Sequence, residues 1–198
     1  LENLFYLLDN AKEKNKRHAR GLSEWLTRIH ASAIEEDLAP PIKDQFTAEL
    51  MLRTLKERLV VKGKDISEED TVVQRFIAIQ KARLRVDDDQ LTYRLLKFFY
   101  PDWDYLTSEK LKEVCPKLDD IRRTLEEHKT HPLGTLFFRF CNRYNTVFML
   151  LGDAVFEEKN YLHDPEEIFK DGESLTLAIR EAYQKRFRQQ RRHLRRLA

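Results

Sequence analysis

The stretch of residues 133–156 constrains the fold of this chain more than any other. Its apolar side chains recur every three to four positions, which is the period of an α-helix with a buried face. Further apolar residues widen that face and leave only a narrow polar strip, so the pattern predicts a core helix that other helices surround on most sides. The predicted face holds Leu133, Phe137, Phe140, Tyr144, Val147, Phe148, Leu151 and Val155, it is widened by Phe138, Cys141, Met149 and Leu150, and the polar strip holds Thr135, Arg139, Asn142, Arg143 and Thr146.

A membrane-spanning helix is the competing interpretation of the same stretch. Arg139, Arg143 and Asp153 lie inside it, and a charged side chain at membrane depth costs several kcal/mol. We therefore predict a helix in a protein core. His131 and Pro132 mark its start, because proline suits the first turn of a helix and disfavours helical geometry in the residue before it.

Composition favours helices throughout. Of 198 residues, 41% are hydrophobic and 35% charged, and only 5 glycines and 6 prolines are present for the many turns of a β-rich fold. We predict an all-α fold with one domain over residues 1–198, a single helical bundle of about six or seven helices around the central apolar helix. The 2 cysteines, Cys115 and Cys141, are expected to be packed, reduced thiols, which indicates a cytoplasmic protein.

Local signals divide the rest of the chain into helices. Gly21 interrupts the polar middle of a long helical pattern, so either two helices meet there or one helix continues through it. Pro40 breaks the chain before a helix expected at residues 42–61. Ser67, followed by three acidic residues, is typical of a helix N-terminus, and Pro116 predicts a kink in a later helix.

Three consecutive carboxylates, Asp87 to Asp89, allow two interpretations. They could bind a hard cation, or they could cap a helix predicted for residues 90–99. Neither a glycine turn nor a regular ligand spacing follows them. We therefore predict a helix cap and no metal site, and no other motif indicates a cofactor.

The charges are distributed unevenly along the chain. The last acidic residue is Glu181, and seven bases follow it; without them, 29 bases stand against 34 acids. An acidic body therefore carries a basic tip. We predict a basic amphipathic helical extension over residues 185–198, in which the candidate contacts for a polyanion or a partner protein are Lys185, Arg186, Arg188, Arg191, Arg192, Arg195 and Arg196.

The helix that carries these bases also has an apolar stripe. Such a stripe is the usual means by which a surface helix packs on a bundle. We expect its first half to dock and its second half to extend among the arginines. The docking half holds Leu175, Ile179, Ala182, Tyr183 and Phe187, and the extension holds Gln190, Leu194 and Leu197.

Aromatic and acidic residues are interleaved in the loop at residues 100–105. Ring faces and carboxylates both attract positive charge, so the loop could hold a cationic group or anchor a basic partner. The alternative is that the rings fold inward and cover the end of the core. The candidate partner-binding residues of this loop are Tyr100, Asp102, Trp103, Asp104 and Tyr105.

Arg123 and His128 have four residues between them. The pair resembles the Arg-x4-His element of the HEPN family of helical nucleases, and the resemblance covers these two residues alone. It implies that the arginine polarises a phosphate and that the histidine handles a proton, usually across a dimer. A helical nuclease is therefore the enzymatic interpretation of this chain.

No motif assigns a catalytic activity. A glycine-rich phosphate loop, a nucleophile elbow and zinc-ligand spacing are all missing from the sequence, so no catalytic residue is assigned and an enzyme is the less favoured class. We predict a non-catalytic helical binding module that presents its C-terminal arginine-rich helix to a polyanion, most simply nucleic acid. The alternatives are a protein-interaction or scaffold domain, whose basic helix pairs with an acidic partner or a second copy of this chain, and a cytoplasmic domain of a membrane protein that lies on an anionic membrane surface.

Overall fold

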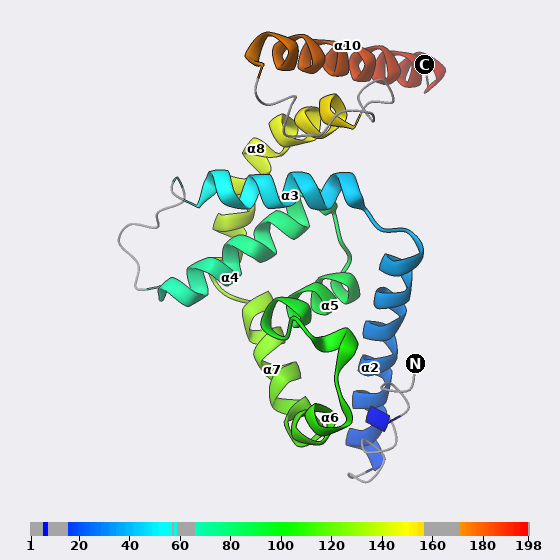
Figure 1. Ribbon diagram of the computed structural model, residues 1–198, viewed down its shortest axis with the longest axis vertical. Helices are drawn as coiled ribbons and strands as arrows, with labels where there is room; N and C mark the ends of the chain where they lie inside the picture. Colours follow the sequence, from blue (N-terminus) through cyan, green and yellow to red (C-terminus); the bar gives the residue numbers. More distant parts are fainter. Residues whose placement is uncertain (1–5, 8–15, 57, 59–65, 157–170, 198) are drawn as a thin grey trace.

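The computed structural model describes residues 6–7, 16–56, 58, 66–156 and 171–197. Over these ranges the chain is helical without any strand, so the prediction of an all-α helical bundle is confirmed (Figure 1). The helices in chain order are α2 (Lys16–Leu38), α3 (Ile42–Leu55), α4 (Glu68–Ile79), α5 (Asp88–Phe99), α6 (Ser108–Val114), α7 (Leu118–Lys129), α8 (Gly134–Val155) and α10 (Gly172–Leu197), with the short turns η1 (Gln80–Leu84), η2 (Trp103–Tyr105) and η3 (Cys115–Lys117) between them.

Helix starts follow the capping signals of the sequence. Ser67 caps α4, because its side chain accepts a hydrogen bond from the amide of Asp70 at 2.9 Å. Asp87 caps α5 in the same way through the amide of Gln90 at 2.8 Å. Each cap satisfies an amide that has no partner within the first helical turn. The capping interpretation of the three consecutive aspartates is therefore confirmed.

The predicted helix breaks have different outcomes. Gly21 lies inside α2, which continues through it, and its carbonyl accepts a hydrogen bond from Arg122 of α7 at 3.2 Å. At Pro116 the 3-10 turn η3 separates α6 from α7, because proline has no amide to donate. The helix expected at residues 42–61 ends at Leu55, and the last part of that range lies outside the described residues.

The buried apolar side chains form two clusters rather than one. The first lies among α2, α5, α6, α7 and the first part of α4, and the second lies among α3, η1, α8 and the end of α4. Helix α4 therefore joins both, and Figure 1 shows it between the group around α5 and α7 and the group around α3. Fully buried members include Leu26, Leu95 and Leu96 in the first cluster and Met51, Phe137 and Cys141 in the second.

Helix α8 packs against α4, α3, η1 and α10, and all of its side chains in the two clusters belong to the second, so it is the central helix of that cluster and not of both. Phe137 is completely buried, and the predicted polar strip is exposed, Arg139 included. Other helices cover less of the apolar face of α8 than predicted, since Phe140 is only half-buried and Val147 is 55% exposed. The described helices do not enclose the whole of so wide an apolar face. Among the described helices, none combines the length and the apolar character needed to cross a membrane.

Helix α10 lies across one end of the molecule, beside the end of α8 (Figure 1). Ala182 is buried against the body, and Leu175 and Ile179 are half-buried. The prediction that Tyr183 and Phe187 dock is wrong, because they are 56% and 54% exposed. A small alanine permits close packing of two helices, so it faces α8 while the large rings point away from it.

Candidate functional site

Helix α10 presents three faces, because successive residues of an α-helix are rotated by about 100°. The docking face carries Ala178, Ala182 and Arg186, four residues apart. A second face is apolar and a third is basic, each about a third of a turn away from the docking face. The helix is thus fixed along one side and presents two chemically different sides outward.

The apolar face consists of Tyr183, Phe187 and Leu194, and Leu194 is 65% exposed. The rings of Tyr183 and Phe187 are nearly parallel, with an interplanar angle of 18° and centroids 6.3 Å apart. Large apolar side chains exposed along one helix face are a candidate interaction surface.

The basic face consists of Arg188, Arg192 and Arg195, and Arg191 lies between it and the apolar face. These four and Arg196 are exposed, and none pairs with an acid among the described residues. Arginines three and four apart on a helix repel each other when no acid separates them.

Two of the predicted bases face the body instead. Arg186 donates from Nη2 to Asp153 Oδ1 at 3.1 Å and from Nε to Oδ2 of the same carboxylate. Lys43 of α3 donates to Asp153 Oδ1 at 3.0 Å. Lys43, Arg186 and Lys185 line a cleft of about 390 Å³ between α3, α8 and α10.

The Asp153 carboxylate links α10 to α3 and α8. Burial opposes its ionisation, but the hydrogen bonds from Arg186 and Lys43 outweigh that effect, so the pKa of Asp153 lies below its ordinary value. The hydrogen bond to Asp153 in turn raises the pKa of Arg186. The charge of Arg186 is therefore compensated within the protein.

A buried arginine supports this junction from the side of η1. Arg83 donates from Nε to Thr47 Oγ1 at 2.8 Å and from Nη2 to Asp44 at 2.6 Å. Burial lowers the pKa of Arg83, and the charge of Asp44 counters part of that shift. Gly152 of α8 lies directly against Thr47, where an added Cβ would be 2.7 Å from Thr47 Cγ2. The part of the body that contacts α10 is therefore tightly packed.

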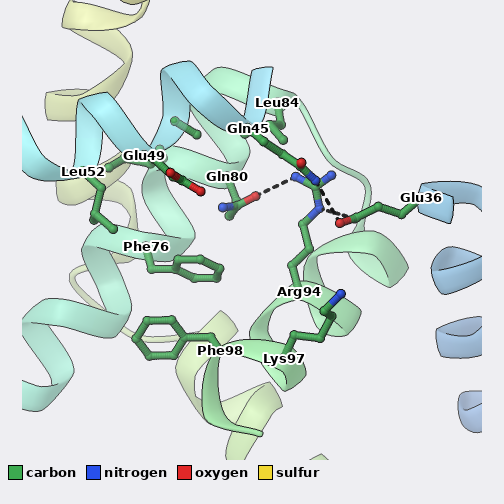
Figure 2. Close-up of a pocket in the computed structure, with 12 residues that line it drawn as sticks. Glu36, Gln45, Glu49, Leu52, Phe76, Gln80, Leu84, Arg94, Lys97 and Phe98 are labelled. Carbon is green, nitrogen blue, oxygen red and sulfur yellow. Dashed lines mark hydrogen bonds and ion pairs between the residues drawn. The ribbon is translucent and has the colours of Figure 1, made fainter. Parts of the chain in front are cut away.

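A second concave site opens between the two core clusters (Figure 2). Its volume is about 320 Å³, and its lining comes from α2, α3, α4, η1 and α5. Phe76 and Phe98 lie side by side on its apolar floor, with ring centroids 4.7 Å apart. Leu52 and Leu84 add aliphatic surface to the lining.

Arg94 organises the polar wall of this pocket. It donates from Nε to Glu36 at 2.9 Å and from Nη1 to Gln80 Oε1 at 2.9 Å, as Figure 2 shows. Gln45 donates to the other oxygen of Glu36 at 3.0 Å. The bonds join α2, α3, η1 and α5, so the wall is built by four separate elements.

The pocket borders an irregular stretch of backbone. Gln80 and Leu84 belong to a π turn, an insertion in a helix that often accompanies a functional site. Arg85 then has a φ of 54°, a left-handed conformation that is uncommon outside glycine.

The inner residues of the aromatic and acidic loop serve the protein itself. Trp103 is buried in the first cluster. Asp104 accepts hydrogen bonds from the Tyr93 hydroxyl at 3.0 Å and pairs with Lys97 at 2.9 Å. Burial, aided by Asp104, raises the pKa of Tyr93 to about 12. The inward interpretation therefore holds for Trp103, and Asp104 is occupied by partners.

The outer residues of the loop are at the surface. Tyr105 is 84% exposed, and Tyr100 is exposed beside the Trp103 ring. Asp102 pairs with Lys110 at 2.7 Å. The loop thus offers one fully exposed ring and one acid that is already neutralised.

Arg123 and His128 engage different partners on α7. Arg123 is exposed and pairs with Asp120 at 2.7 Å. The His128 ring stacks on Phe99 with centroids 5.3 Å apart, and its Nδ1 lies 3.7 Å from Asp70. The structure thus places the arginine in a surface ion pair and the histidine against α4 and α5.

The acidic residues in the first turn of α5 pair with bases of other helices. Asp88 pairs with Lys129 at 2.7 Å, and Asp89 pairs with Arg28 at 3.3 Å. Within the described ranges, no group of three or more histidine, cysteine, aspartate or glutamate side chains is arranged to hold a metal ion.

Sequence reasoning missed the pocket. Arg94 and Glu36 are 58 residues apart, and no local pattern relates them. The sequence does contain one indication, a set of polar residues within an otherwise apolar helical stretch. The structure buries all four of them, Gln74, Arg75, Gln80 and Arg83. Buried polar side chains at such positions indicate a specific network rather than a plain core.

The chain was compared with protein-family models, with curated proteins and with solved structures, and none of the three comparisons gave a match.

Proposed function

We propose that this protein is a non-catalytic module that binds single-stranded nucleic acid along α10. The observation that carries the proposal is the juxtaposition of an exposed aromatic face and an exposed arginine face on one helix. Guanidinium groups fork onto phosphates, and nucleic-acid bases stack on aromatic rings. Both parts of a nucleotide therefore find a matching surface on α10.

Charge favours a polyanion as the ligand. Arg188, Arg191, Arg192, Arg195 and Arg196 have no acidic partner among the described residues, so their repulsion weakens the helix that carries them. A strand of phosphates supplies the missing negative charges at short, regular intervals.

The aromatic pair favours a single strand over a duplex. The base faces of a duplex are already stacked on each other, whereas those of a single strand are available to Tyr183 and Phe187. Each stacked base contributes about 1 to 3 kcal/mol in proteins of this kind.

The position of α10 reduces repulsion from the acidic body. Beyond Arg186, every described side chain of α10 is exposed, and the helix lies at one end of the molecule (Figure 1). A strand that follows its outer faces meets the arginines at a distance from most of the acids.

Fluorescence anisotropy with a labelled RNA of about 20 nucleotides tests the proposal. At about 50 mM salt we expect saturable binding by the unmodified protein. Replacement of Arg191, Arg192, Arg195 and Arg196 with glutamine should weaken binding at least tenfold. A matched control removes four exposed bases elsewhere, through Arg53→Gln, Lys56→Gln, Lys112→Gln and Lys117→Gln, and should weaken it much less.

The contribution of stacking is measured with Tyr183→Ala and Phe187→Ala. Each should weaken binding of the single strand by about fivefold or more while changing duplex binding little. Tyr105→Ala is the control, because it removes an exposed ring away from α10. Equal losses for single strand and duplex would show that the rings do not stack on bases.

An acidic protein, a second copy of this chain and an anionic membrane are the alternative ligands. Absence of RNA and DNA binding at low salt, together with retention on anionic vesicles or on an acidic helix, would replace the nucleic-acid proposal with one of these. A cytoplasmic location belongs to the proposal and is supported by the two cysteines, neither of which forms a disulfide.

A further inference from the structure

We propose that the pocket between the two core clusters binds a small, neutral, planar apolar molecule that carries a carbonyl-type hydrogen-bond acceptor. The pocket has a volume of about 320 Å³, which lies in the range of sites for small organic ligands. It is separate from α10, so the proposal is independent of nucleic-acid binding.

The floor selects for a flat apolar body. The Phe76 and Phe98 rings are only partly buried although they pack on the first core cluster, so ring surface remains open toward the pocket. Leu52 and Leu84 approach the same space from the second cluster. A bicyclic aromatic seated there would bury apolar surface from both clusters at once.

The wall supplies hydrogen-bond donors that are not used elsewhere. Arg94 employs Nε and Nη1, and its Nη2 has no partner among the described residues. Gln80 must direct Oε1 toward Arg94, because a guanidinium only donates, and its Nε2 is then left without a described partner. The side chain of Arg94 is only 10% exposed, and Gln80 is 9% exposed. Neither donor atom is sealed from solvent, so an acceptor on a ligand in the pocket can reach both of them.

The charges of the lining favour a neutral ligand over an anion. Arg94 is compensated by Glu36, and Lys97 is compensated by Asp104. Glu49 also lines the pocket, and it forms no ion pair with a described residue. Its negative charge would repel a carboxylate or a phosphate but not a ketone, an amide or a quinone.

The neutral naphthalene ketone prodan is a suitable probe, because its emission shifts to the blue in apolar surroundings. We expect saturable, one-site binding to the full chain. Gln80→Glu keeps the acceptor for Arg94 and the size of the side chain but removes the Nε2 donor, so it should weaken prodan binding about fivefold to tenfold. Because the new carboxylate lies near Glu36, a thermal melt must show that the variant is folded at the temperature of the binding measurement.

Leu52→Trp fills the pocket and should abolish prodan binding, whereas Leu136→Trp makes the same change at an exposed position of α8 and should leave it intact. Phe187→Ala should also leave it intact, which excludes the aromatic face of α10 as the prodan site. The proposal is overturned if the unmodified protein shows no saturable binding, or if Gln80→Glu or Leu52→Trp binds prodan as the unmodified protein does. If Leu52→Trp fails to fold, prodan binding by Gln80→Glu is the test of the proposal.

Discussion

At the scale of single residues, two helical glycines have opposite roles. A Cβ added at Gly152 of α8 would lie 2.7 Å from Thr47 Cγ2 and 3.3 Å from Lys43 Cγ. Thr47 is fully buried and bonded to Arg83, so it has little freedom to move. At Gly21 of α2 the nearest atom is the end of a flexible arginine side chain at 3.7 Å.

The pair gives a prediction with a built-in control. Gly21→Ala should stabilise the protein by up to about 1 kcal/mol, because alanine is the better helix former. Gly152→Ala should destabilise it by about 1 to 3 kcal/mol, because the clash with Thr47 outweighs the same gain. Urea unfolding of the two variants measures the difference. A Gly152→Ala protein as stable as the Gly21→Ala protein would show that α3 and α8 are not closely packed there.

Residue-scale features could be predicted from sequence where they depend on near neighbours. Ser67 and Asp87 cap amides three positions away, and Pro116 acts within its own turn. The role of Arg186 could not be predicted, because its partner Asp153 is 33 residues distant. In the sequence it is one base among seven, and only the packing of α10 on α8 distinguishes it.

At the scale of elements, the attachment of α10 depends on a small set of contacts. Ala182 is the one fully buried side chain among its described residues, and Asp153 joins Arg186 of α10 to Lys43 of α3. The ion pair therefore acts beside the apolar contacts of Ala182 and of the half-buried Leu175 and Ile179. The orientation of the exposed aromatic and basic faces depends in part on the ionised Asp153 carboxylate.

Asp153→Asn should lower the free energy of unfolding by about 1 to 3 kcal/mol at neutral pH, because charge-assisted hydrogen bonds to Arg186 and Lys43 are lost. Hydrogen exchange of the α10 amides should accelerate in this variant. Glu181→Gln is the control on the same helix, since Glu181 is exposed and forms no ion pair with a described residue. Unchanged exchange in Asp153→Asn would mean that α10 is held by other contacts.

The pH dependence of the same pair follows from the direction of the shift. The pKa of Asp153 is lower in the folded protein than the ordinary value near 3.8. Its contribution is therefore complete above about pH 4 and is lost as the pH falls further, through the lowered pKa. The stability difference between the unmodified protein and Asp153→Asn should shrink over that interval, as urea unfolding at several pH values would reveal.

The positions of the helices could largely be predicted from the sequence, whereas the burial of their apolar faces could not. The start of α8 after Pro132 and its exposed polar strip follow from local chemistry and helical period. The helical period does not indicate how much of an apolar face the neighbouring helices cover. Val147 and Phe187 were therefore predicted to be buried, although both are exposed. The pocket escaped prediction for a related reason: its lining is gathered from five elements that are separated in sequence.

At the scale of the whole molecule, two cores share α4, and α8 leads from the second core to α10 (Figure 1). Seven bases follow the last acid at Glu181, while the rest of the chain has more acids than bases. Opposite net charges are therefore separated in the molecule: the body is acidic, and the helix at one end is basic. Such a distribution favours binding of a polyanion by its basic end alone.

The salt dependence of RNA binding tests this account most directly. Each phosphate neutralised on a single strand should contribute about −0.7 to the slope of log affinity against log salt concentration, so four or five contacts with the α10 arginines give about −3. Replacement of Arg191, Arg192, Arg195 and Arg196 with glutamine should flatten the slope toward zero without a change in melting temperature. A slope near zero for the unmodified protein, or an equal slope for the variant, would contradict the proposal that α10 binds nucleic acid.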